Sequence, residues 1–222
     1  SFIINAWGGY SINAKTDLYN AVDTFGDSTT TASAGLSFST KTSDLKNTGI
    51  AGGADIWYGD KFQFGVGAYY LQGFKNTKTL TYQSGVSNIV NTTQLNYIPI
   101  LLQVRFFLVE GLYAGVGAGV AMVNGGKSET TTNIAAGNGL TGVPNSNTYS
   151  GTALWAEGRL GYRLGLSDML GLDLFSIFSY QVSTVSFSDV KSTGSSTASA
   201  TAADVKNNGL NITPGLAISF KF

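Results

Sequence analysis

The stretch Leu210-Asn-Ile-Thr-Pro-Gly-Leu-Ala-Ile-Ser-Phe-Lys-Phe222 closes the chain and decides its fold class. Every second residue from Leu210 to Phe222 is apolar, and the residues between them are small or polar. Because successive side chains of a strand point to opposite faces, this strand has one apolar face and one polar face. Such a strand, ending on an aromatic residue, indicates the closing strand of a transmembrane β-barrel.

Seven other stretches have the same strand-like character. With the closing strand, the predicted set is 1–12, 48–58, 62–74, 94–107, 111–123, 151–165, 171–185 and 208–222. Each can supply the ~9–11 residues that a tilted strand needs to cross a bilayer. We therefore predict an all-β fold, an antiparallel up-and-down barrel of eight strands that occupies residues 1–222 as a single domain.

The connections between these strands alternate strictly between short and long. The short ones lie at 58–61, 108–111 and 166–170, and the long ones at about 13–47, 75–93, 124–150 and 186–207. This alternation is typical of outer-membrane barrels, with short periplasmic turns and long extracellular loops. Parts of the loops alternate too, for example Lys78–Tyr82, so strands are expected to extend beyond the membrane. A ten-stranded barrel stays possible if residues 32–42 form an additional membrane hairpin.

The composition agrees with a membrane barrel and excludes several other classes. The chain has 29 glycines, 13 phenylalanines and 11 tyrosines, which suits many turns and aromatic girdles. Its 13 basic and 13 acidic residues cancel, so nothing favours binding to nucleic acid. The sequence contains no run of about 18 apolar residues, so no transmembrane helix is predicted. The chain lacks cysteine, which excludes disulfides and decides no compartment. It starts without Met, as expected of a mature protein whose signal peptide has been removed.

The charged residues within the predicted strands all fall on the inward face. They are Asp55, Arg105, Glu157, Arg159, Arg163, Asp173 and Lys221. A charge facing lipid near the midplane would cost about 2–4 kcal/mol. A soluble barrel with these charges outside would instead have to fit the large apolar residues of eight strands into one small interior. The pattern therefore favours the membrane barrel.

The segment Leu95–Phe107 followed by Gly111–Gly117 resembles the proline-containing strand and hairpin of the small outer-membrane β-barrel superfamily, which includes the outer membrane protein A and X types. Phe222 is similar to the terminal assembly signal read by the barrel assembly machinery of the outer membrane. The resemblance implies an integral protein of a Gram-negative outer membrane and implies no particular activity.

An eight-stranded barrel has an interior just wide enough to be filled by side chains. The seven inward charges are therefore expected to form an ion-pair network that closes the lumen, and a gated path for ions or solutes is the alternative. The inward aromatic residues, Trp7, Trp57 and Trp155 with Tyr69, Tyr97, Tyr113 and Phe175, are interpreted as core filling. The glycines at 65, 67, 115, 117 and 119 are interpreted as relief of crowding beside bulky neighbours.

Pro99 and Pro214 favour a second hypothesis for the same interior. Proline cannot donate to a strand ladder, and a closed barrel has no edge strand to accommodate it. Missing bonds at both residues could open a lateral gap, and Trp7, Tyr97 and Trp155 would then line a site for a small apolar molecule. Two bulges, or local ends of pairing, are the simpler interpretation of the prolines.

Enzymatic chemistry has little support in this sequence. The chain has no His and no Cys, so the usual base and nucleophile pairs and the commonest metal ligands are absent. We expect no cofactor, no metal and no catalytic residue. The predicted function is a non-enzymatic, monomeric barrel that presents surface loops for envelope integrity or surface interaction. Its expected partners are outer-membrane lipids, the barrel assembly machinery and an extracellular ligand or small apolar molecule.

Overall fold

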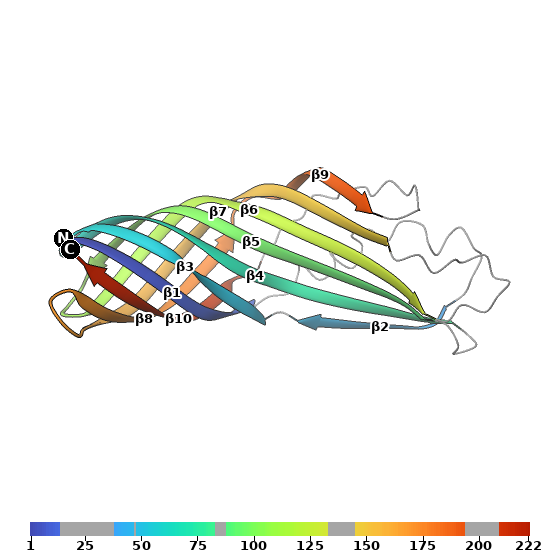
Figure 1. Cartoon of the computed structure of the whole chain (residues 1–222), viewed down its shortest axis with the longest axis horizontal. Coiled ribbons are helices and arrows are strands. Elements are labelled where there is room, and N and C mark those ends of the chain that lie inside the picture. Colours follow the sequence, from blue (N-terminus) through green and yellow to red (C-terminus); the bar gives the residue numbers. More distant parts are fainter. Residues whose placement is uncertain (14–37, 47, 83–87, 133–144, 194–208) are drawn as a thin grey trace.

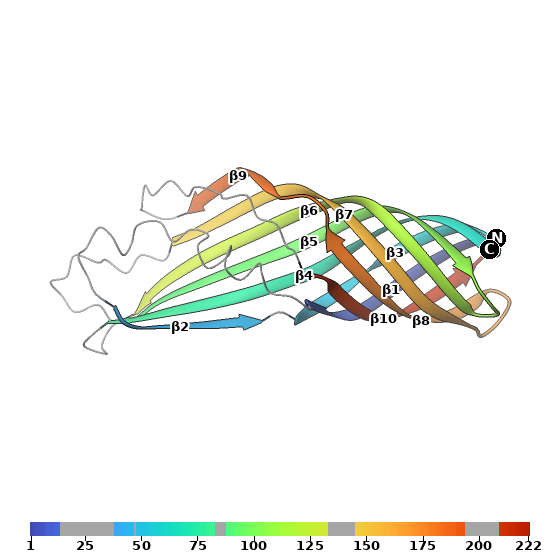
Figure 2. The ribbon, with the colours of Figure 1, turned by 180° about the vertical axis from the view of Figure 1, so that it is seen from behind.

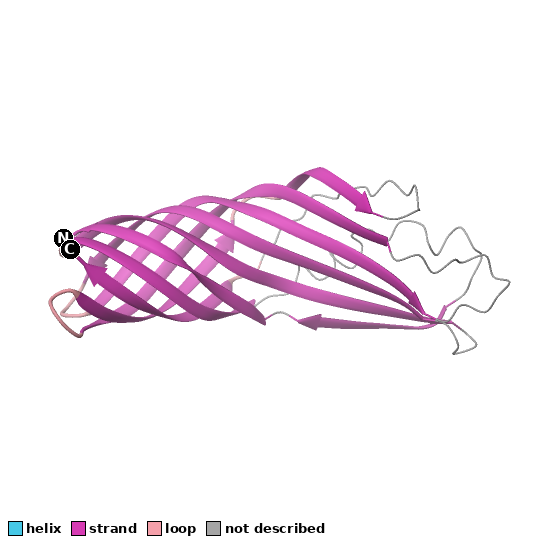
Figure 3. Cartoon of the chain, in the orientation of Figure 1, coloured by secondary structure: helices cyan, strands magenta, loops and turns pink. Residues whose placement is uncertain are grey.

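The structure, a computed structural model, describes residues 1–13, 38–46, 48–82, 88–132, 145–193 and 209–222. These residues form strands joined by short turns (Figure 3). The strands are β1 (Phe2–Asn13), β2 (Phe38–Lys46), β3 (Thr48–Gly59), β4 (Phe62–Tyr82), β5 (Asn88–Phe107), β6 (Leu112–Thr132), β7 (Asn145–Gly165), β8 (Leu170–Gln181), β9 (Ser186–Thr193) and β10 (Asn211–Lys221). No helix among the described residues is long and apolar enough to cross a membrane.

Eight of these strands close into an antiparallel barrel in the order β1-β3-β4-β5-β6-β7-β8-β10. The closing contact joins the two ends of the chain, because β10 pairs with β1 from Ile3↔Lys221 to Asn13↔Asn211. Both termini lie at the same end of the barrel, beside the short turns (Figure 1). The predicted eight-stranded fold is therefore confirmed.

Two of the short turns depend on glycine. Gly59 has φ +122° between β3 and β4, and Gly111 has φ +81° between β5 and β6. Residues with a Cβ rarely adopt such angles, so glycine is required at both turns. The turns fix the registers of the two hairpins, which start at Gly59↔Gln63 and Phe107↔Tyr113.

The strands β4 to β7 run far beyond the other four and form an open curved sheet at the end opposite the termini (Figures 1 and 2). β2 pairs with the outer half of β4, and β9 pairs with the outer half of β7. The boundaries predicted from sequence were therefore too short for β4 to β7, and the expected extension through Lys78–Tyr82 is confirmed. Apart from Lys78–Tyr82, these outer segments lack an apolar alternation, because neither face has to meet lipid.

The ten-stranded alternative is wrong for the described part of the chain. Residues 38–42 belong to β2, which pairs with β4 beyond the barrel and does not enter the membrane wall. Residues 32–37 lie outside the described residues. A single residue separates the end of β2 from the start of β3. Both strands pair with β4, so β2 continues the line of β3 outward and adds no strand to the barrel.

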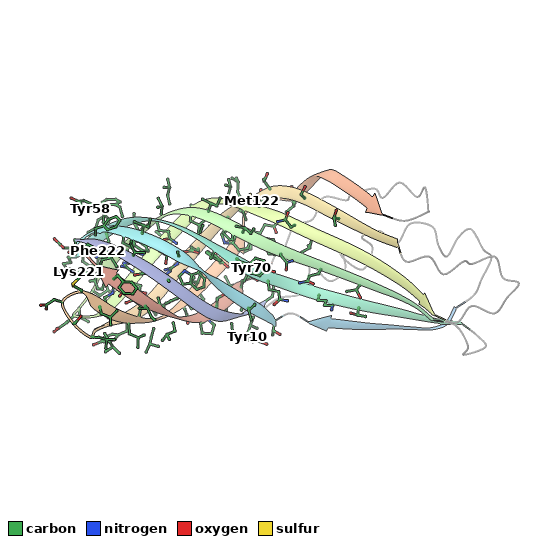
Figure 4. The ribbon with its side chains drawn as sticks, in the orientation of Figure 1. Tyr10, Tyr58, Tyr70, Met122, Lys221 and Phe222 are labelled. Atoms are coloured by element: carbon green, nitrogen blue, oxygen red, sulfur yellow. The ribbon has the colours of Figure 1, made fainter. Side chains whose placement is uncertain are left out.

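The barrel is apolar outside and polar inside. Side chains such as Leu102, Val116 and Tyr58 are 73%, 61% and 70% exposed on the outer wall. Figure 4 places Tyr58 and Phe222 at the end with the termini, and Tyr10, Tyr70 and Met122 farther along the wall. Asp55, Asp173 and Gln181 are fully buried within the wall. A soluble barrel would show the opposite distribution, so the exterior is built to contact lipid.

Candidate functional site in the barrel interior

The inward charges form two groups. In the first, which joins β3 and β7, Arg159 Nη1 donates to Asp55 Oδ2 at 2.6 Å. Arg159 Nη2 lies 3.4 Å from Glu157 Oε1. Asp55 is fully buried and Arg159 is 5% exposed. Arg159 is thus held between two carboxylates away from water.

Neutral donors complete the bonding of Glu157. Tyr69 donates its hydroxyl to Glu157 Oε2 at 3.0 Å, and Gln103 Nε2 donates to Oε1 at 2.8 Å. Trp155 Nε1 in turn donates to the Tyr69 hydroxyl at 3.1 Å. A buried carboxylate is tolerated only when its oxygens accept such bonds, so this network connects β4, β5 and β7 through the lumen.

The second group joins β5, β7 and β8 nearer the short turns. Arg163 binds Asp173 through both carboxylate oxygens, with Nε–Oδ1 at 2.6 Å and Nη2–Oδ2 at 2.7 Å. Arg105 Nη1 lies 3.6 Å from Asp173 Oδ2, and Arg105 Nε donates to Gln63 Oε1 at 2.6 Å. The Arg105 guanidinium also stacks over the Trp57 ring, 4.1 Å from its centroid. Six of the seven predicted charges therefore meet in the lumen.

Lys221 does not join them. Its strand position is inward, because it pairs directly opposite the buried Ile3. However, Lys221 is exposed at the last position of β10. Figure 4 shows it at the end of the barrel beside Phe222. The lumenal assignment of Lys221 was wrong because alternation gives the face of a residue and not its depth.

The inward glycines make room for this network. A Cβ on Gly67 would lie 2.3 Å from Asp55 Oδ1, and one on Gly65 would lie 2.6 Å from the Trp57 ring. A Cβ on Gly117 would lie 3.0 Å from both Gln103 Cγ and Glu157 Cγ. These contacts support the interpretation of crowding relief. Gln63 and Gln103 were missed as members of the network. Both face inward: Gln63 pairs directly opposite Arg105, and Gln103 lies two residues before Arg105 on β5.

Aromatic side chains fill the lumen beside the ionic groups. Trp7 packs against Tyr69 and Phe175 at centroid distances of 5.1 and 5.4 Å. Tyr97 packs against Trp155 at 5.2 Å. Because Trp155 also bonds to Tyr69, the structure brings Trp7, Tyr97 and Trp155 into one continuous layer. All three are at most 6% exposed. Their role as a ligand site stays a prediction.

The two prolines lie apart and on opposite faces of the wall. Pro99 is buried, whereas Pro214 is exposed on the outer face. Between β4 and β5, pairing stops at Ala68↔Ile100 and resumes at Leu71↔Tyr97 with no shift of register.

The gap beside Pro214 has the same form. Between β1 and β10, pairing stops at Gly9↔Gly215 and resumes at Ile12↔Ile212, again in register. On their other edges, Pro99↔Ala121 and Pro214↔Ser176 lie within unbroken ladders. Neither proline forms a bulge, so each interrupts one ladder locally. The bulge in β4 lies farther out, between Gln72 and Lys75.

The described residues offer little for chemistry beyond ion pairing. No group of three or more His, Cys, Asp or Glu side chains among them is arranged to hold a metal ion. The carboxylates of the lumen are each engaged by arginine, and the aromatic layer covers them. The described interior is thus a packed core of ion pairs, neutral hydrogen-bond donors and aromatic rings.

An even number of antiparallel strands, an apolar outer wall, and short turns at one end opposite long extensions define a transmembrane β-barrel of the outer-membrane type. No protein-family model matches the chain, and no curated protein matches it.

Among solved structures, three outer-membrane or surface proteins share its general outline. Neisserial surface protein A is 9% identical with a TM-score of 0.41, covering 100% of this chain and 97% of its own. The outer membrane protein OprG of Pseudomonas aeruginosa is 13% identical, with a TM-score of 0.41, and the match covers 100% of this chain and 96% of OprG. The attachment invasion locus protein Ail of Yersinia pestis is 12% identical, with a TM-score of 0.41, and the match covers 99% of this chain and 97% of Ail. Likeness at this level carries no information on ligand or activity.

Proposed function

We propose that this protein is a non-enzymatic, closed-lumen barrel of a Gram-negative outer membrane that presents its long extracellular segments for envelope integrity or surface interaction. The observation that carries the proposal is the filled interior. Six charged side chains and a continuous aromatic layer occupy the lumen of an eight-stranded barrel. A barrel of this size has no spare width for a water-filled channel.

The open sheet formed by β4 to β7, with β2 and β9 at its edges, supports the presenting role. It projects the chain well past the apolar belt that Tyr10, Tyr70 and Met122 border (Figure 4). Segments displayed on a rigid scaffold are where binding residues concentrate in proteins. The extension thus gives the surface segments a fixed platform above the lipid.

A planar-bilayer measurement tests the closed lumen. The purified protein should give no discrete openings at any applied voltage within the range that the bilayer tolerates. A general porin of larger diameter serves as the positive control for insertion. Discrete, voltage-independent openings of the wild-type protein would contradict the proposal.

Cysteine labelling tests the orientation, because the chain has no cysteine of its own. Thr148→Cys lies in the extension of β7, and Asp168→Cys lies in the short turn between β7 and β8; both positions are exposed. A membrane-impermeant maleimide should label intact cells at position 148 and not at position 168. Disrupted cells should be labelled at both, and the reverse pattern on intact cells would contradict the assignment.

A second candidate function, lateral passage or binding of a small apolar molecule, is favoured by the ladder gaps beside Pro99 and Pro214. Trp7, Tyr97 and Trp155 would be the interior contacts of such a molecule. Pro214→Ala restores a donor to the β1–β10 ladder, and it should lower uptake of a fluorescent apolar probe if passage occurs there. The closed-lumen proposal expects equal uptake by the wild type and this variant.

The proposed partners follow from the exterior. Outer-membrane lipids would cover the apolar belt, and the barrel assembly machinery would read Phe222, which is 68% exposed. The Phe222 ring lies 6.3 Å from that of Phe2, and the two residues exchange backbone hydrogen bonds of 2.8 and 3.2 Å. Phe222→Ser should therefore lower the amount assembled in cells while refolding in vitro stays intact. We propose a monomer, which size-exclusion chromatography with light scattering in detergent tests.

A further inference from the structure

Arg105 is buried without the hydrogen bonds that its charge requires. Its side chain has no exposed surface, and neither Nη1 nor Nη2 has a hydrogen-bond partner among the described residues. Only Nε is bonded, to Gln63 Oε1. Leaving buried donors of a charged group unsatisfied is costly, so an unbonded guanidinium edge in the lumen calls for an acceptor.

The carboxylate beside Arg105 does not meet this need. Asp173 Oδ2 lies 3.6 Å from Nη1, too far for a hydrogen bond, and it accepts a bond of 2.7 Å from Arg163. The group of Arg105, Arg163 and Asp173 has two positive charges and one negative charge, leaving one positive charge. The group of Arg159, Asp55 and Glu157 has the opposite excess. Charge thus balances over the whole lumen but is positive around Arg105.

The surroundings of Arg105 supply donors and aromatic faces. The hydroxyl of Tyr113 is buried without a hydrogen-bond partner, and its ring centroid lies 5.0 Å from the Arg105 guanidinium carbon. Trp57 covers one face of the guanidinium. The buried acceptor Gln103 Oε1 also lacks a partner, but its amide is bonded to Glu157 in the negative group.

We propose that the positive group of the lumen, centred on Arg105 Nη1 and Nη2 with the Tyr113 hydroxyl, binds a single small monovalent anion of the size of chloride. An anion accepts bonds from these donors and offsets the excess positive charge of the group, whereas a water molecule would offset none of that charge. We assign a halide because Arg105 is fully buried between the Trp57 and Tyr113 rings, where a small ion needs the least displacement of side chains. This site is independent of the surface role proposed above.

The site has a defined depth in the lumen. Arg105 lies two residues before the end of β5, and the Arg163 side chain of the same group is 16% exposed. On the other side, the layer of Trp7, Tyr69 and Trp155 covers the lumen. The site therefore lies nearer the short-turn end of the lumen, and the aromatic layer separates it from the other end.

Anomalous diffraction from crystals grown with bromide in place of chloride tests the site directly. The expected result is one bromide peak in the lumen within hydrogen-bond distance of Arg105 Nη1 or Nη2. A map with water at that position, or with bromide only on the outer surface, overturns the proposal.

A solution measurement covers the case in which crystals are not obtained. Because a ligand that binds only the folded state raises its stability with concentration, the melting temperature of the wild type should rise when gluconate is replaced by chloride at constant ionic strength. Arg105→Met should lose this rise, and Lys75→Met, which removes an exposed cation outside the lumen, should keep it. If Arg105→Met does not fold, Arg105→Lys serves instead and should show a reduced rise. An equal chloride response in the wild type and the Arg105 variant overturns the proposal.

Discussion

Substitution of Asp55 tests the physical account of the lumen most directly. Asp55→Asn keeps the shape of the side chain and removes its charge, so that Arg159 loses its anionic partner at 2.6 Å and keeps only the carboxylate of Glu157 at 3.4 Å. Both members of the pair are at most 5% exposed, so water does not replace the lost contact. Removing one partner of a buried pair costs about 3–5 kcal/mol when the other charge is left uncompensated. Glu157 still faces Arg159 at 3.4 Å, so the loss should fall at the lower end of that range.

This loss is large against the whole stability of a folded domain, roughly 5–15 kcal/mol. The assay is urea unfolding of the refolded protein in lipid vesicles, followed by fluorescence of the three tryptophans. Asp55→Asn should shift the midpoint strongly to lower urea at an unchanged slope. Lys75→Met, an exposed cation outside the lumen, provides the control and should not shift it.

A combined substitution distinguishes the loss of one charge from the loss of the whole charged group. Asp55→Leu with Arg159→Met and Glu157→Gln replaces all three charges of this group by neutral side chains, so that no buried carboxylate is left without its cation. Such replacement of a buried pair or triad is often neutral or stabilising. The triple variant should therefore be more stable than Asp55→Asn. A near-wild-type midpoint for Asp55→Asn, or a triple variant less stable than Asp55→Asn, would refute the account of a mutually dependent network.

Three further predictions address the packing of the wall and the lumen. Gly67→Val places a Cβ 2.3 Å from Asp55 Oδ1, and it should cost about 1–3 kcal/mol through overpacking, read from the same urea titration; an unchanged midpoint would contradict the crowding argument. Trp7→Ala removes a ring that is 6% exposed, so it should cost about 3–5 kcal/mol and give bilayer openings that the wild type lacks. Pro214→Ala should restore a hydrogen bond to Tyr10, which stabilises the folded state by about 1 kcal/mol. It also raises the conformational entropy of the unfolded chain, which lowers the stability by about 0.4–1 kcal/mol. The urea midpoint should therefore change little, and a large shift in either direction would be inconsistent with a single missing bond.

Alternation in the sequence was sufficient to predict the membrane-spanning part of the fold. The lipid face must be apolar at every second residue, and this requirement leaves a pattern that can be read in 208–222 and its seven counterparts. Outside the membrane the requirement disappears. The outer halves of β4 to β7 were therefore assigned to loops, although they continue as paired strands to Tyr82 and Thr132.

The same limit applies to the lumen. The alternation of side chains along each strand correctly placed Asp55, Arg105, Glu157 and Arg159 on the inward face. Alternation does not give depth, so Lys221 was assigned to a cluster from which the end of its strand separates it. Partner choice was also out of reach, because it depends on the shear that aligns strands far apart in the sequence.

The proline gaps illustrate how small a local interruption of a closed barrel can be. In an antiparallel ladder, opposite residues alternate between hydrogen-bonded and non-bonded pairs. When one N–H donor is missing from a hydrogen-bonded pair, that pair is lost, and the adjacent non-bonded pair is no longer flanked by bonded pairs on both sides. Two missing pairs with an unchanged register are what the β4–β5 and β1–β10 ladders show.

Each gap thus corresponds to one absent hydrogen bond, at Pro99 and at Pro214. The two gaps lie in different ladders, with β1, β3 and β4 between them along the shorter way around the barrel. A lateral opening wide enough for a ligand would require several adjacent bonds of one ladder to break, and each exposed group costs several kcal/mol in lipid. The prolines therefore lower the barrier to separation at two separate points, and neither point alone amounts to a gate.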